Sequence, residues 1–170
     1  MLIRTSLALA TSVVAVPALS AQAVLKIQLP RLDIAEYHKP YVAAWIEKAS
    51  DQSFAGNVAL WYDVDKRNNG GAKWLKDMRS WWRKSGHALP AADGVTGATR
   101  SAGEHAINLL DAPAAAALAP GQYELVVEAA RENGGREVLR VPFDWPVKKA
   151  QSARAQGQGE LGTVSFDARP

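Results

Sequence analysis

The sequence predicts a mainly β protein: an antiparallel β-sandwich, immunoglobulin-like or related, of about seven strands with one inserted amphipathic helix. Two patterns support this prediction. Apolar and polar residues alternate in short runs along most of the 170-residue chain, as expected for strands that bury one face. A single segment instead carries apolar residues at helical spacing. Many short alternating strands with one helix between them are typical of a sandwich.

Seven stretches carry the strand pattern. In chain order they are residues 25–29, 41–47 and 57–62, a strand beginning near His105, and residues 123–129, 139–145 and 161–167. The fifth and sixth form the clearest hairpin, because the turn Asn133-Gly134-Gly135 contains glycines that can supply the positive φ angles of a tight turn. Residues 112–120 are expected to be a connector, and residues 146–160 a long exposed loop or a partly disordered segment.

The predicted helix covers residues 73–84. Its apolar side carries Trp74, Leu75, Met78, Trp81 and Trp82. Its other side carries Lys73, Lys76, Arg79, Arg83 and Lys84, and Gly86 and Pro90 are expected to end it. Such a basic face is usually solvated, but it could also dock an acidic patch on a redox partner.

The N-terminus predicts export to the periplasm. Residues 1–23 have the features of a cleavable signal peptide: Arg4 in the first part, an apolar run over residues 6–19, and a small-residue cleavage site that ends at Ala23. The apolar run is too short to span a bilayer, so no transmembrane segment is expected. Residues 24–170 are predicted to form one soluble domain.

Composition argues against several functional classes. The chain has no cysteine, so disulfides and thiolate-bound clusters are excluded and any electron transfer needs an acquired organic cofactor. A net charge of +3 gives no reason to expect nucleic acid as a partner. His38, His87 and His105 lack metal-ligand spacing, so no metal site is predicted. With no catalytic triad or carboxylate pair in view, a non-catalytic protein is favoured over an enzyme.

The segment that carries the functional prediction is Asp93-Gly94-Val95-Thr96-Gly97-Ala98-Thr99-Arg100. Its Asp-x-x-Thr-Gly-Ala-Thr pattern resembles the motif on which exported bacterial carriers receive covalent FMN from a flavin transferase. By this resemblance Thr99 is the acceptor hydroxyl. Gly97 and Ala98 are small enough to let the backbone enter another enzyme, and an exposed loop is expected. The alternative is an ordinary turn between strands.

Four further residues have candidate roles at this site. Thr96 is a second hydroxyl, expected to hold the loop through a local hydrogen bond. Asp93 either orients the loop, helps the transferase recognise it, or simply begins a turn. Arg100 either pairs with the FMN phosphodiester or is a solvated loop residue. Trp82 is expected near the surface, where it could lie against the isoalloxazine ring. Core packing is expected for Trp45, Trp61 and Trp74.

Several stretches together resemble the DUF2271 family of predicted periplasmic proteins. They are residues 41–47, 58–61, 73–83, 93–100, 103–105 and 121–132. The Lys-Trp-Leu…Trp-Trp-Arg helix before the Thr-Gly-Ala-Thr segment is the most specific part. The connector at residues 112–120 departs from the pattern, since a more polar turn is expected there.

This resemblance implies a periplasmic flavoprotein that carries electrons, with FMN attached covalently at Thr99. It also implies a PepSY-type membrane redox protein as partner and iron assimilation as one setting. Two alternatives remain open. One is an unmodified periplasmic module that binds a ligand or protein, and the other is a metal- or haem-handling accessory protein.

Overall fold

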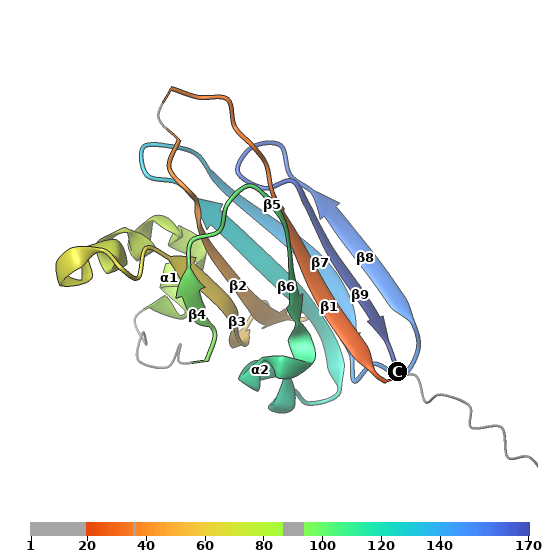
Figure 1. The fold of residues 1–170 in the computed structure, drawn as a ribbon. Helices are drawn as coiled ribbons and strands as arrows, with labels where there is room; N and C mark the ends of the chain where they lie inside the picture. The colour runs from red at the N-terminus through yellow and green to blue at the C-terminus, as the bar shows by residue number, and fades with distance from the viewer. Residues whose placement is uncertain (1–19, 36, 87–93) are drawn as a thin grey trace, which may run out of the picture.

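Two β-sheets face each other in the computed structural model of the chain, which describes residues 20–35, 37–86 and 94–170 (Figure 1). The four-stranded sheet has the order β5 (Gly103–Asn108), β1 (Gln22–Leu29), β9 (Thr163–Arg169) and β8 (Gln151–Gln156). The five-stranded sheet has the order β4 (Thr96–Ala98), β3 (Phe54–Tyr62), β2 (Tyr41–Lys48), β6 (Gly121–Ala130) and β7 (Arg136–Trp145). The predicted mainly β sandwich is confirmed.

One strand pair departs from the predicted antiparallel arrangement. β4 runs parallel to β3, with Thr96 opposite Leu60 and Ala98 opposite Tyr62. Parallel neighbours need a long crossover connection, and here the chain between them contains the helical segments η1 (Arg67–Asp77) and α1 (Arg79–Lys84). In Figure 1 these segments lie beside the five-stranded sheet, away from the four-stranded one. We call η1 and α1 together the helical cover.

Two described strands are missing from the sequence-based prediction. β4 lies in the segment expected to be an exposed loop, and β8 lies in residues 146–160, which were expected to be a loop or partly disordered; both expectations were wrong. β8 pairs along its whole length with β9, from Gln151 opposite Ala168 to Gln156 opposite Thr163. Its inward positions include only alanines as apolar residues, so the alternation in hydrophobicity is too weak to read.

The other strands are found where they were predicted, most of them longer by a few residues. β1 begins at Gln22, two residues before the expected start of the mature domain, and Ala23 is fully buried. The hairpin between β6 and β7 is confirmed. Its positive φ angle belongs to Asn133, at 55°, and not to a glycine. A Cβ at Gly134 would lie 2.5 Å from Cζ of Arg131, so a larger residue there would have to displace the end of that side chain.

The predicted single helix over residues 73–84 is two helices that meet at Met78. The first is a 3₁₀ helix and the second a short α-helix. The fully buried side chains are Leu75 in the 3₁₀ helix, Met78 at the junction and Trp81 in the α-helix, and they share the side of the helical cover that faces the sheet. Trp74 is only partly buried, so its predicted place in the core was wrong. Trp45 and Trp61 are buried as expected.

The five-stranded sheet is buried on both faces. One apolar core fills the space between the two sheets and includes Leu25, Ile46 and Phe166. A second core lies between the five-stranded sheet and the helical cover and includes Trp45 and Trp81. The fold therefore has three layers, and β2 is buried from Val42 to Glu47.

Glu128 of β6 attaches the helical cover to the sheet. Its side chain is fully buried and accepts hydrogen bonds from the backbone N–H groups of Ser80, at 3.1 Å, and Trp81, at 2.8 Å. These are N–H groups of the first turn of α1, which has no cap from its own N-cap residue. A carboxylate at a helix N-terminus also interacts favourably with the helix dipole. Arg136 supplies the balancing positive charge.

A second buried carboxylate, Glu47 of β2, ties the same layers together. It accepts hydrogen bonds from the Trp45 indole at 2.7 Å and from Arg140 at 2.8 Å, and it pairs with Lys84 of α1 at 3.2 Å. Burial alone raises the pKa of the Glu47 carboxyl. The hydrogen bonds from Arg140, Trp45 and Lys84 outweigh burial and place this pKa below its ordinary value of 4.5.

Replacing Glu128 should loosen the helical cover. We expect Glu128→Ala to lower the free energy of unfolding by about 1–3 kcal/mol, since it removes the cap of α1 and leaves the N–H groups of Ser80 and Trp81 without their acceptor. Chemical denaturation measures the change. Glu104→Ala is the control, because Glu104 is 62% exposed and lies 3.8 Å from Lys26, a surface pair worth about 0–1 kcal/mol. Equal losses in the two variants would contradict the assigned role.

Glu47 predicts a specific loss of stability in acid. Because its folded-state pKa is lowered, its stabilising effect is complete above the unfolded-state value of about 4.5 and disappears as the pH falls below it. Glu47→Gln cannot titrate. The difference in unfolding free energy between the native protein and this variant should therefore be largest at neutral pH and shrink below pH 4.5. A difference that is constant across this range would show that the charge of Glu47 does not matter.

Candidate functional site

The segment with the predicted acceptor is the edge of the five-stranded sheet. Thr96, Gly97 and Ala98 form β4, and the N–H of Thr99 donates to the carbonyl of Tyr62 at 3.2 Å. Only β3 pairs with β4 among the described residues, so the outer side of β4 has no strand beside it. Asp93 lies outside the described residues. An edge strand presents backbone groups that another protein can reach.

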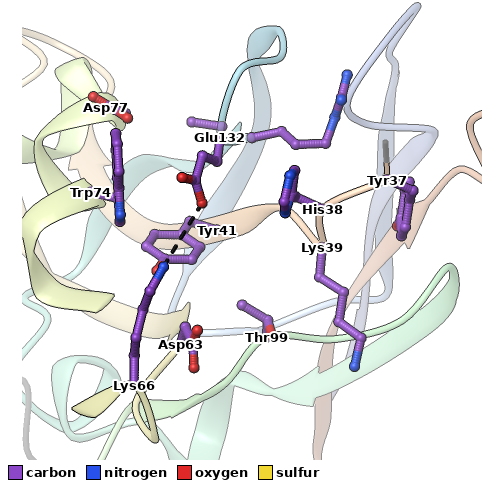
Figure 2. Close-up of a pocket in the computed structure, with 12 residues that line it drawn as sticks. Tyr37, His38, Lys39, Tyr41, Asp63, Lys66, Trp74, Asp77, Thr99 and Glu132 are labelled. Carbon is purple, nitrogen blue, oxygen red and sulfur yellow. Dashed lines mark ion pairs between the residues drawn. The ribbon is translucent and has the colours of Figure 1, made fainter. Parts of the chain in front are cut away.

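Thr99 lines a pocket of about 450 Å³ at one end of the five-stranded sheet (Figure 2). The lining residues are Tyr37, His38, Lys39, Tyr41, Asp63, Lys66, Trp74, Asp77, Thr99, Ala130, Arg131 and Glu132. They converge because of the topology: β2 begins at this end, and β3, β4 and β6 all end there. The helical cover adds Trp74 and Asp77, which share a side of the 3₁₀ helix at a spacing of three residues.

Aromatic rings and charges of both signs share this pocket. Lys66 pairs with Glu132 at 4.0 Å, as the dashed line in Figure 2 shows. Arg131 is held by two hydrogen bonds to Glu160, at 2.9 and 3.1 Å. Lys39 forms no ion pair with any described residue. The pocket therefore keeps one uncommitted cation close to Thr99, and in Figure 2 Lys39 and Lys66 are seen on either side of that threonine.

Tyr41 stays protonated at neutral pH. Burial raises the pKa of its hydroxyl; a hydrogen bond with the backbone of Asp63 lowers it, and the negative charges of Asp63 and Glu132 raise it further. The net result lies above the ordinary value of 10.0. Tyr41 therefore offers the pocket a neutral aromatic ring and not a phenolate.

Arg100 points away from the Thr99 pocket. Its guanidinium carbon lies 5.3 Å from the centre of the Trp61 ring, within the range of a cation–π contact. The edge of Trp61 also meets His105, with ring centres 5.6 Å apart. Arg100, Thr96 and Gly97 line a second hollow of about 430 Å³. Pairing of Arg100 with a phosphodiester at Thr99 stays a prediction.

Trp82 also lies apart from Thr99. It packs beside Trp81, with ring centres 6.3 Å apart, and against Gly86, where a Cβ would come within 2.3 Å of its ring. It is partly exposed, as expected. Among the described residues, the tryptophan that shares the Thr99 pocket is Trp74. A flavin contact at Trp82 stays a prediction.

The histidines are dispersed in the described part of the chain. His38 lines the Thr99 pocket, His105 packs on Trp61, and His87 lies outside the described residues. No group of three metal-binding side chains occurs within residues 20–35, 37–86 and 94–170. In the same ranges no helix is long and apolar enough to cross a membrane.

A family model described as "Predicted periplasmic protein (DUF2271)" matches residues 22–163. The chain belongs to the DUF2271 family. The matched range runs from the first residue of β1 to the first residue of β9, so it includes the five-stranded sheet, the helical cover, the Thr99 pocket and every strand of the four-stranded sheet except β9 beyond Thr163. No curated protein and no solved structure matches the chain. The sequence resemblance to this family is thus confirmed.

The small residue at position 97 is not required by the fold. A Cβ on Gly97 would lie 3.7 Å from Cδ1 of Trp61, an ordinary contact. We therefore expect Gly97→Ala to leave the unfolding free energy unchanged or raise it by up to about 1 kcal/mol, measured by denaturation. Gly71→Ala is the control, because its Cβ would lie 1.9 Å from the carbonyl oxygen of Asp63 and should destabilise strongly. A large loss in both variants would mean that the β3–β4 packing needs glycine at 97.

Proposed function

We propose that this DUF2271 protein is a periplasmic electron carrier with FMN attached covalently to the Thr99 hydroxyl. The observation that carries the proposal is the position of Thr99: it lies where the edge strand β4 ends, and it lines a pocket of ligand size. Sites for small organic ligands usually have volumes of about 300–1,000 Å³. The PepSY-type membrane partner and the setting of iron assimilation come from the family resemblance described above.

The pocket residues suit the chemical groups of FMN. Its walls hold three aromatic side chains, Tyr37, Tyr41 and Trp74, which can pack on a planar ring. Lys39 and Lys66 supply positive charge for a phosphodiester. When bound, FMN would supply reversible uptake and release of electrons, which no side chain of this cysteine-free chain can provide.

The surroundings of Thr99 support its proposed role as the acceptor. Its hydroxyl makes no hydrogen bond to another described residue, while its backbone is fixed by Tyr62. In the transfer, the Thr99 oxygen would bond to the FMN phosphorus of FAD, the bond to the AMP phosphate would break, and AMP would leave. The hydroxyl proton would pass to a base of the transferase. The open side of β4 gives that enzyme a route to the threonine.

The helical cover offers a docking surface for an electron-transfer partner. Lys73, Lys76, Arg79 and Arg83 are exposed on it, and the cover also supplies Trp74 and Asp77 to the pocket. A partner with an acidic surface would be drawn to this side of the molecule, since complementary charge mainly raises the rate of encounter.

The intact mass of the protein, purified under denaturing conditions from cells with an active flavin transferase, tests the proposal. We expect a gain of one FMN less one water on the peptide that contains Thr99. Thr99→Ala should lose this gain, and Thr99→Ser should keep it, because serine retains the hydroxyl.

Ser101→Ala is the matched control, since Ser101 carries an exposed hydroxyl two residues beyond Thr99 and lies outside the Asp-x-x-Thr-Gly-Ala-Thr motif. It should retain the added mass. An unmodified native protein in the presence of active transferase would refute the proposal and favour an unmodified binding module that uses the same pocket.

A further inference from the structure

Trp74 is the side chain that distinguishes the Thr99 pocket from a simple polar cleft. It sits on η1 next to Leu75, which is fully buried under the helical cover. Leu75 and Met78 fix the 3₁₀ helix on the sheet, and this places Trp74 on the neighbouring side, where it is partly exposed and lines the pocket. In Figure 2 Trp74 and Tyr37 lie at opposite sides of the pocket, with Tyr41 between them.

The indole N–H of Trp74 has no acceptor among the described residues. The two buried tryptophans of the second core use theirs within the protein: Trp45 donates to Glu47 at 2.7 Å, and Trp81 donates to Asn57 at 2.8 Å. Tryptophan N–H groups usually find a partner when they are buried. Trp74 therefore presents both an aromatic face and an unused donor to whatever occupies the pocket.

We infer that this pocket seats the isoalloxazine ring of the FMN on Thr99, with Trp74 packed on the ring. This inference rests on the proposed function. The ring is planar and carries carbonyl oxygens and ring nitrogens, so it suits an aromatic wall with a nearby donor. Offset-stacked or edge-to-face aromatic rings attract each other beyond the effect of the apolar area that they bury. The phosphate end stays at Thr99, beside Lys39 and Lys66.

Local charges support the same orientation. Lys66 is already held by Glu132, whose carboxylate lies toward Tyr41 in Figure 2, whereas Lys39 has no ion-pair partner among the described residues. A phosphodiester at Thr99 would give Lys39 the anion that it lacks. The ring would then extend from the threonine, away from Arg100 and toward Tyr41 and Trp74, which line the same pocket.

Flavin fluorescence tests whether the isoalloxazine ring lies in this pocket against Trp74. Tryptophan in contact with isoalloxazine quenches its emission, so the folded native protein should fluoresce severalfold less than the same protein after denaturation. Trp74→Leu should raise the folded-state emission severalfold while the intact mass still shows bound FMN. Trp74→Phe keeps a ring and provides a second variant that preserves packing volume better.

Trp82→Leu is the matched control, because Trp82 is also partly exposed on the helical cover but does not line the pocket in the described structure. It should leave the quenching unchanged. Equal quenching in the native protein and both Trp74 variants, with FMN present by mass, would overturn the inference and leave the carrier function standing. Relief of quenching by Trp82→Leu alone would also overturn it. Absence of the FMN mass in the native protein would instead refute the proposed function itself.

Discussion

The contact on which this structure most depends is the one between the Glu128 carboxylate and the first turn of α1. A six-residue α-helix and a kinked 3₁₀ helix are too short to be stable in water alone. They persist because Leu75, Met78 and Trp81 are buried on the five-stranded sheet and because a buried carboxylate satisfies backbone donors that α1 leaves unpaired. The cover in turn closes one side of the Thr99 pocket. Stability of the outer layer and the shape of the site therefore have a common origin.

The sequence predicted the strands whose two faces differ in polarity, and it failed where that difference is small. β8 has only alanine as its apolar residue, and Thr96-Gly97-Ala98 has the composition of a turn although its backbone pairs with β3. Trp74 was predicted to lie in the core because a helix with about 3.6 residues per turn puts it on the same side as Leu75. The observed 3₁₀ helix has about three residues per turn, and Trp74 is only partly buried. Thr99 was proposed as the acceptor from its resemblance to a local motif. The pocket around Thr99 was not predicted, because residues 37–41, 63–66 and 130–132 come together only through the order of the strands.

The parallel pair of β3 and β4 separates two environments within a few residues. Thr99 lines one pocket and Arg100 lies over Trp61 in another. The strand β4, which precedes both residues, is short and lies at the edge of the five-stranded sheet, so its outer side can be reached without opening the sandwich. The residues that shape the first pocket belong to well-anchored elements: Arg131 is fixed by Glu160, and Trp74 follows from the packing of Leu75. A group attached at the threonine would meet preformed walls.

The arrangement of the four-stranded sheet has a consequence for the timing of folding. β1 lies between β5 and β9, and Gln22 pairs with Arg169. The central strand β1 therefore pairs with a strand that is about 140 residues later in the sequence. Contacts so distant in sequence slow folding, because a long loop must close before they form. During synthesis this sheet cannot be completed until β9 has left the ribosome. A chain whose sheet is completed late stays unfolded for longer, which would suit the export of a member of a family described as periplasmic.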